Sequence, residues 1–125
     1  MKSILLIEDD PFLIDIYTTK FKEVGFEVDV VSDGEMAIAK LKEKVPDVLL
    51  VDIVLPKIDG WQILEETKEM KEKNPEKFKD LKIIILSNLG QKEDVEKGLK
   101  LGATKYLIKA HFTPSEVVEE IKKLF

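Results

Sequence analysis

Five short runs of large apolar residues, many of them β-branched, recur along the chain and alternate with segments of helical period. The runs lie at Ser3–Ile7, Glu27–Val31, Asp47–Val51, Lys82–Leu86 and Lys105–Ile108. Apolar runs of this length, bounded by turn residues, are typical of strands that are buried on both faces. The pattern therefore predicts five buried β-strands.

The segments between the runs repeat apolar residues every three or four positions, which predicts amphipathic helices. Asp10-Pro11 marks the start of the first helix and Gly25 its end. Thr113-Pro114-Ser115-Glu116 forms a capping box with proline at the first helical position, so the last helix begins there. Residues 71–80 are polar and contain Asn74-Pro75, so we expect a long irregular surface connection.

Strict alternation of buried strands and amphipathic helices favours a parallel sheet with helices on both faces. Right-handed crossovers leave few topologies, and the leading one is an α/β, doubly wound (βα)5 flavodoxin-like fold. Its five parallel strands have the order 2-1-3-4-5. No linker or repeat divides the chain, so residues 1–125 are expected to form one domain with no output domain.

Composition narrows the possible functions. The chain has no cysteine and a single histidine, His111, which removes thiol chemistry and histidine-rich metal sites. Its net charge is −5, which argues against direct nucleic-acid binding. No apolar run approaches the roughly 20 residues of a membrane span, and no signal-peptide pattern is present, so we expect a cytoplasmic protein without membrane contact.

Polar residues follow each predicted strand at its carboxyl end, where open α/β sheets bind their ligands. They are Glu8-Asp9-Asp10, Ser32-Asp33, Asp52, Ser87-Asn88 and Lys109. In the order 2-1-3-4-5 the third strand is central. Asp52 is therefore expected to lie near the acidic residues on one side and near Ser87 and Lys109 on the other.

Three carboxylates in one crevice repel one another, and a hard divalent cation such as Mg²⁺ removes that penalty. An ammonium group and a hydroxyl beside them suit the oxygens of a phosphoryl group, and aspartate can itself be the nucleophile. Each residue alone has an ordinary interpretation: Asp52 as a turn or cap residue, and Glu8-Asp9-Asp10 as acids at a helix start. The joint placement at several strand ends favours a phosphoryl-transfer site.

The same residues lie in motifs that resemble the receiver domain of two-component response regulators over nearly the whole chain. ILLIEDDPFL resembles the opening strand with its acidic pair, and LLVDIVLPKIDGWQIL resembles the phosphoacceptor segment. IIILSN and ATKYLIKA resemble the strands that carry the hydroxyl, the aromatic residue and the lysine. The resemblance is to the stand-alone, chemotaxis-regulator-like members of the family.

The resemblance implies a phosphorylation-activated signalling switch. Its implied residues are Asp52 as phosphoacceptor; Glu8, Asp9, Asp52 and the backbone carbonyl of Val54 as ligands of Mg²⁺ or Mn²⁺; Ser87 and Lys109 on the phosphoryl oxygens; and Ser87 and Tyr106 as the switch pair. The implied phosphate donor is a sensor histidine kinase or a phosphotransfer protein. The implied output face comprises the fourth helix, fifth strand and fifth helix, which control a downstream protein target.

The resemblance further implies no enzyme activity beyond the chain's own phosphorylation and dephosphorylation. It also implies a monomer or a weak phosphorylation-dependent dimer. A phosphorylation-independent docking module is the alternative. Two other classes fit less well: a flavodoxin-type FMN site needs a hydroxyl- and glycine-rich loop after the first strand, and a haloacid-dehalogenase-type phosphatase needs an acid where Val54 stands.

Three details depart from the family pattern. Ala110 follows Lys109 where proline in a cis peptide is usual, so we expect a trans bond there. Asn88 stands where a small residue is usual, which would narrow access to the phosphoryl group. Val54 and Leu89 are apolar at positions that meet the hydrolytic water in the family, so slow self-dephosphorylation is expected.

The segment Gln91–Leu101 has a thin apolar stripe and a glycine, Gly98, within its helical pattern. Two interpretations remain open at this point. The segment is either a marginal element suited to a two-state switch, or a plain surface helix with a close-packing glycine.

Overall fold

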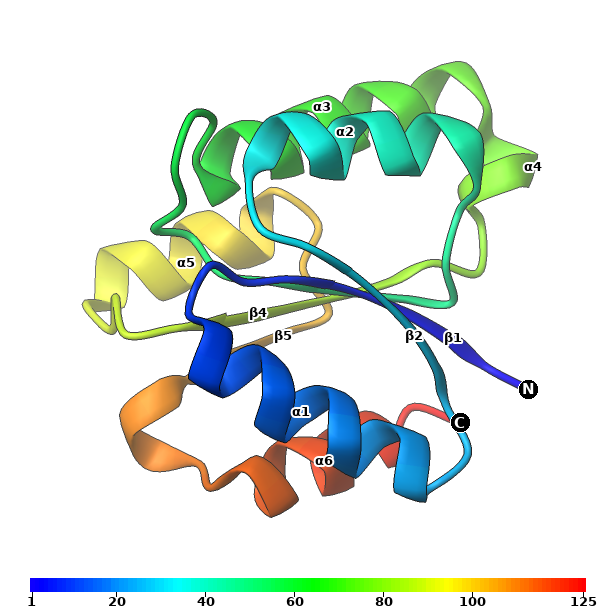
Figure 1. Ribbon diagram of the computed structural model, residues 1–125. Helices are drawn as coiled ribbons and strands as arrows, with labels where there is room; N and C mark the ends of the chain where they lie inside the picture. The colour runs from blue at the N-terminus through cyan, green and yellow to red at the C-terminus, as the bar shows by residue number, and fades with distance from the viewer.

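A five-stranded parallel sheet runs through the middle of the computed structural model, which describes residues 1–125 (Figure 1). The strands are β1 (Ser3–Ile7), β2 (Glu27–Val31), β3 (Val48–Val51), β4 (Lys82–Ser87) and β5 (Lys105–Ile108). Their order is β2-β1-β3-β4-β5 and every pairing is parallel. The predicted topology is confirmed.

Helices cover both faces of this sheet (Figure 1). One layer contains α1 (Pro11–Glu23) and α6 (Pro114–Lys122), and the other contains α2 (Gly34–Glu43), α3 (Gly60–Lys73) and α5 (Lys92–Lys100). A short helix α4 (Pro75–Phe78) follows α3, and a 3₁₀ turn at Lys109–His111 follows β5. None of the helices is long and apolar enough to span a membrane.

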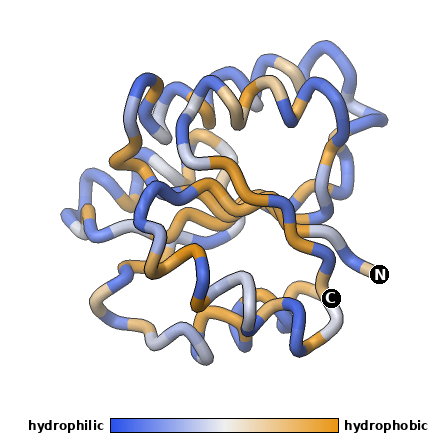
Figure 2. The backbone as a smooth tube through the Cα atoms, in the orientation of Figure 1, coloured by the Kyte–Doolittle hydropathy of each residue, from blue (hydrophilic) through white to orange (hydrophobic).

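Alternate residues of each strand enter two separate apolar cores, because side chains of a strand point to opposite faces. In β3, Leu50 packs in the core beneath α1 and α6, whereas Leu49 and Val51 pack beneath α2 and α3. The strands accordingly form the apolar middle of the molecule in Figure 2. The continuous apolar runs of the sequence follow from this double coverage.

Side-chain caps fix the starts of α1, α2 and α6, each of which follows the carboxyl end of a strand within a few residues. The Oδ1 atom of Asp10 accepts from the backbone N–H of Phe12 at 2.9 Å, and that of Asp33 accepts from Met36 at the same distance. The Oγ1 atom of Thr113 accepts from the N–H of Glu116 at 3.2 Å. Caps satisfy backbone donors that the first helical turn leaves unpaired, so each fixes where its helix starts.

The expectation of an irregular connection over residues 71–80 is wrong. Helix α3 continues to Lys73, Asn74 ends it with its N–H bonded to the carbonyl of Met70 at 2.9 Å, and Pro75 opens α4. Helix α4 buries one aromatic side chain, Phe78, which is only 2 % exposed. One buried aromatic residue in a polar stretch has no periodicity, so the pattern did not reveal it.

Helix α5 is held by few apolar contacts, and Gly98 is its one buried residue. A Cβ atom at Gly98 would lie 2.5 Å from Cδ1 of Ile85 and 2.9 Å from the ring of Tyr106. The glycine therefore lets the helix lie directly against β4 and β5. The close-packing glycine is confirmed, and the thin burial of the helix leaves its two-state behaviour as a prediction.

Replacement of Phe78 by alanine is expected to lower the free energy of unfolding by about 3 to 5 kcal/mol, because it leaves a cavity under α4. Urea unfolding monitored by circular dichroism measures the change. The matched control is Phe12→Ala, at a side chain that is 73 % exposed, which should change stability by less than about 0.5 kcal/mol. Equal effects of the two substitutions would mean that α4 contributes nothing to the core.

Candidate functional site

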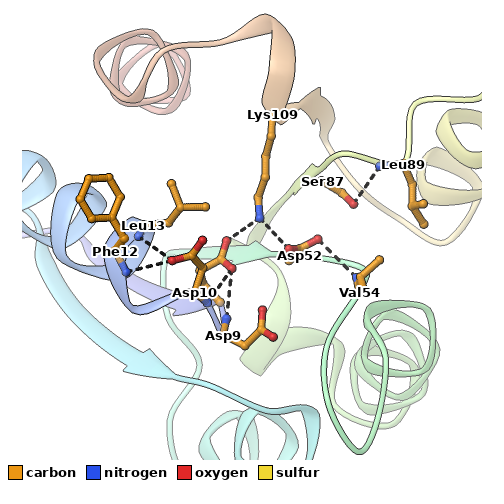
Figure 3. Close-up of polar contacts among 10 residues, drawn as sticks. Asp9, Asp10, Phe12, Leu13, Asp52, Val54, Ser87, Leu89 and Lys109 are labelled. Atoms are coloured by element: carbon orange, nitrogen blue, oxygen red, sulfur yellow. Dashed lines mark hydrogen bonds and ion pairs between the residues drawn. The ribbon is translucent and has the colours of Figure 1, made fainter.

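The residues singled out from the sequence meet at the carboxyl edge of the sheet, because the central strands are in register. Ile7 of β1 pairs with Val51 of β3, which pairs with Ile85 of β4. Glu8 and Asp52 therefore leave their strands at the same level, and Ser87 ends β4 opposite Ile108. Lys109 follows β5 directly and reaches back over the sheet edge (Figure 3).

The side chain of Lys109 joins two of these carboxylates. Its Nζ atom lies 2.6 Å from Oδ2 of Asp52 and 2.7 Å from Oε1 of Glu8 (Figure 3). All three side chains are largely removed from solvent. The chain contains no cis peptide, so Lys109 is presented by a trans bond to Ala110, as expected. Buried ion pairs with good geometry are costly to break, so this contact fixes the site.

The acidic side of the site contains more negative charge than Lys109 can balance. Carboxylate oxygens of Glu8, Asp9 and Asp52 all lie within 4.8 Å of one another. Three carboxylates and one ammonium group leave two negative charges. The second oxygen of Glu8 accepts from the backbone N–H groups of Asp9 and Asp10, at 3.1 and 3.2 Å, whereas Asp9 itself is exposed.

This donor set fits a hard divalent cation. Mg²⁺ prefers oxygen ligands and keeps several waters, so a few carboxylates at the mouth of a crevice suffice. The exposed Asp9 supplies a carboxylate on the solvent side, and Glu8 and Asp52 supply oxygens from within. A 2+ charge also matches the two negative charges left over by Lys109.

Burial raises the pKa of the Glu8 carboxyl, and the nearby charge of Asp52 adds to this, although Lys109 opposes it. Burial works against the ammonium of Lys109. Its hydrogen bonds with Asp52 and Glu8 outweigh that cost, so the pKa of Lys109 is raised and the group stays charged. The site thus contains a lysine that stays protonated and more carboxylate groups than this one positive charge can balance.

Ser87 and Tyr106 are connected through the backbone of Leu89. The hydroxyl of Ser87, which is fully buried, accepts from the N–H of Leu89 at 3.3 Å. The hydroxyl of Tyr106 donates to the carbonyl oxygen of the same residue. Burial raises the pKa of Tyr106, and the charge of Asp94 adds to this, so the phenol remains a donor. One residue, Leu89, therefore links the two residues expected to act as a switch, through the two successive peptide groups that flank its Cα atom.

The loop after Asp52 places a backbone donor against the carboxylate. The N–H of Val54 donates to Oδ1 of Asp52 at 3.3 Å, and the Val54 side chain is 62 % exposed at the mouth of the site. Asp10 is a helix cap, as expected, and does not join the acidic group.

Gly60 is a packing position beside the site that sequence reasoning missed. A Cβ atom there would lie 2.4 Å from the carbonyl oxygen of Asp52, and the N–H of Gly60 donates to the carbonyl of Ile53 at 2.8 Å. The glycine therefore lets the start of α3 lie against the strand end that carries Asp52. Its place before a helix suggested only a turn, since nothing in the sequence signals a close approach.

Replacement of Glu8 by glutamine, with metal removed by EDTA, is expected to stabilise the chain by about 1 kcal/mol near neutral pH. The new amide would still accept from the N–H groups of Asp9 and Asp10, and Lys109 would keep Asp52. The pKa of Glu8 is raised in the folded state, so the wild type loses stability as the pH rises through that pKa, whereas the glutamine variant does not. Below the pKa of about 4.3 that glutamate has in the unfolded chain, both side chains are neutral, and the stability difference between variant and wild type should vanish.

Urea unfolding as a function of pH measures this gain. Glu69→Gln, at an exposed position of α3, is the control and should show no comparable dependence on pH. A destabilised Glu8→Gln variant near pH 7 would show that the Lys109–Glu8 pair contributes more than its burial costs.

Comparison with known proteins agrees with this geometry. The family model of the response regulator receiver domain matches residues 4–122. The chain is 33% identical over 121 residues to the probable transcriptional regulator ycf27 of Guillardia theta, covering 97% of this chain and 44% of that protein. It is 30% identical over 123 residues to the alkaline phosphatase synthesis transcriptional regulatory protein PhoP of Bacillus subtilis, covering 98% of this chain and 48% of that protein. The chain spans about half the length of these relatives.

Solved structures give the same result. The receiver domain of the Francisella response regulator 1452 matches with a TM-score of 0.83 and 30% identity, covering 99% of this chain and 96% of that one. The BeF3-activated DrrB receiver domain matches with a TM-score of 0.81 and 27% identity, covering 99% and 97%. The Vibrio cholerae chemotaxis protein CheY4 shares the fold, with a TM-score of 0.85 and 23% identity. The match covers 100% of this chain and 99% of that one. The chain belongs to the response regulator receiver domain family.

Proposed function

We propose that the chain is a phosphorylation-activated switch in which Asp52 accepts a phosphoryl group. The observation that carries the proposal is the contact of Lys109 with Asp52 and Glu8 beside the exposed carboxylate of Asp9. In this arrangement the carboxylate of Asp52 lies beside the positive charge of Lys109 and beside the oxygens of Glu8 and Asp9, which could ligate a cation. Such a surrounding stabilises the charge that develops on a transferring phosphoryl group.

In the proposed reaction, a carboxylate oxygen of Asp52 attacks the phosphorus. The bond between phosphorus and its donor breaks, and the donor leaves with the electron pair. Lys109 is already held beside Oδ2 of Asp52 and would contact a phosphoryl oxygen there. Glu8, Asp9, Asp52 and the carbonyl of Val54 would hold Mg²⁺ or Mn²⁺, which supplies further neutralisation of the phosphoryl charge.

The proposed switch starts at Ser87. Its hydroxyl is bonded to the N–H of Leu89, and a bond to a phosphoryl oxygen would compete with that contact. A shift of the Leu89 peptide would alter the acceptor of Tyr106 and, with it, the packing of Tyr106 against Gly98 of α5. The proposed output surface consists of α5, β5 and α6. It is the same face that the sequence analysis called the fourth helix, fifth strand and fifth helix, because the short helix α4 shifts the helix numbers by one.

The proposed partners are a sensor histidine kinase or phosphotransfer protein and a downstream protein target. We propose that the chain catalyses only its own phosphorylation and dephosphorylation, since Val54 stands where a phosphatase of similar fold needs an acid. The net charge of −5 supports an output through protein contact rather than direct nucleic-acid binding. A cytoplasmic location and a monomeric or weakly dimeric state remain predictions.

Incubation with acetyl phosphate and Mg²⁺ is expected to add one phosphoryl group to the chain, measured by intact mass. Asp52→Asn should abolish the gain, because the amide is not a nucleophile. Asp59→Asn is the matched control, since Asp59 caps α3 through Oδ1 and asparagine caps helices equally well. No gain by the wild type under any condition would favour the docking module.

Two neighbouring substitutions separate the cation from the phosphoacceptor in the same assay. Asp9→Asn should slow the reaction strongly at limiting Mg²⁺, because it removes the solvent-side ligand. Asp10→Asn should leave the rate within about twofold, because Asp10 only caps α1. Equal effects of both would contradict the proposed ligand set.

The phosphoryl group is expected to be long-lived, because the side chains of Val54 and Leu89 cannot orient a hydrolytic water. Val54→Asn combined with Leu89→Glu should accelerate its loss by at least about tenfold, a lower bound below the roughly 10²- to 10⁴-fold that a well-positioned acid–base group contributes. The decay of the phosphorylated mass with time measures the rate. Val24→Asn with Leu99→Glu, at two exposed apolar side chains elsewhere, is the control. An unchanged rate in the first variant would refute the explanation.

A further inference from the structure

A groove of about 410 Å³ lies between α3, α4 and the end of α5. Its apolar part is formed by Phe78, Leu81, Ile83 and Leu101. Leu81 precedes β4 and Leu101 precedes β5, so the groove lies at the amino edge of the sheet. The phosphoacceptor Asp52 is at the carboxyl edge, and the two sites share no residue.

The groove exists because of the segment that the sequence pattern suggested to be irregular. Pro75 and Phe78 of α4 form one wall, and α3 forms another through Thr67 and Lys71. Phe78 is buried at 2 % exposure and Ile83 at 7 %. The hydroxyl of Thr67 is already bonded to the carbonyl of Ile63 at 2.7 Å, so Thr67 offers no free donor to the groove.

Positive charge gathers around this apolar surface although the whole chain has a net charge of −5. Lys68, Lys71 and Lys100 line the groove, against one acid, Glu72. None of the three ammonium groups has a carboxylate within 4 Å. Lys71 and Lys100 lie in last helical turns, where cations are favoured, but Lys68 does not. Three lysines over one apolar groove complement a ligand that is both apolar and negative.

We propose that this groove binds a small amphipathic anion, namely an apolar body with a carboxylate, sulfonate or phosphate group. The apolar body would lie on the half-buried Leu81 and Leu101, above the buried ring of Phe78, and the anionic group would face the three lysines. The volume is within the range of small-molecule pockets, about 300 to 1,000 Å³. Eleven residues line the groove, well short of the roughly 20 to 30 per side of a stable protein interface, which favours a small molecule over a protein segment.

This binding site does not depend on the phosphorylation proposed above, and its test uses the unphosphorylated chain. The probe is 8-anilinonaphthalene-1-sulfonate, an aromatic anion whose fluorescence rises in apolar surroundings. We expect saturable binding at one site. We also expect octanoate, a different amphipathic anion, to displace the probe.

The charge requirement is tested by replacing Lys68, Lys71 and Lys100 with glutamine together. This variant should bind the probe about tenfold more weakly, as the loss of three exposed charge pairs implies. Its affinity for the uncharged N-phenyl-1-naphthylamine should stay within about twofold. A matched variant with glutamine at Lys22, Lys40 and Lys42, three exposed positions in α1 and α2, has the same net charge and should bind both probes as the wild type does.

Amide chemical shifts locate the site. Addition of the probe should move the signals of Thr67, Leu81 and Leu101 and leave that of Asp52 unchanged. An absence of saturable binding, equal weakening in the two lysine variants, or shifts elsewhere would overturn the proposal. Displacement of the probe by an acidic amphipathic peptide but not by octanoate would also overturn it, because the groove would then be a protein docking site.

Discussion

The contact of Lys109 with Asp52 and Glu8 is the interaction on which the rest of the site depends. It joins residues at the ends of β1, β3 and β5, and Lys109 reaches past β4, which separates β5 from β3 in the order β2-β1-β3-β4-β5. Removal of the lysine would leave two buried carboxylates beside each other, which is far more costly than the loss of an exposed pair. The contact still balances only one of three negative charges. The geometry that holds the site residues together therefore leaves the site ready to accept more positive charge.

A single residue, Leu89, plays a comparable part in the path from Ser87 to α5. The N–H and the carbonyl of Leu89 are both engaged, one by Ser87 and the other by Tyr106. A displacement of this residue would thus change two contacts at once. Tyr106 in turn touches Gly98, the one buried residue of α5. A helix with so little buried surface can change its position at small cost in free energy, which suits an element with two states.

The sequence predicted the parallel sheet from periodicity and its order from the few topologies that right-handed crossovers allow, and the meeting of the site residues follows from that order. Continuous apolar runs specify a covered parallel sheet, and a parallel sheet brings the residues that follow its strands to one edge. Close approaches could not be predicted in this way. Gly60 looked like a turn residue, yet a Cβ atom there would collide with the backbone of Asp52. Close packing at Gly98 was one of two interpretations of its segment, and only the structure decided between them.

The segment around α4 shows a different limit. Phe78 was surrounded by polar residues, and a helix of four residues leaves no repeat to detect. Its burial is decided by the space between α3 and β4, which only the folded chain defines. The groove above Phe78 was hidden for the same reason, since its lysines come from two helices that are far apart in the sequence.

The positions of the two sites relative to α5 have a physical consequence. Leu89 and Gly90 join the carboxyl edge of the sheet to the start of α5, and Lys100 and Leu101 at its end line the groove. The helix has only nine residues, so a shift of its start moves its end as well. Under the two proposals together, a groove ligand that binds one position of α5 more tightly would bias the switch at Ser87, and phosphorylation would change the affinity of the groove by the same factor. Opposite edges of the sheet are in this way joined by one lightly held helix.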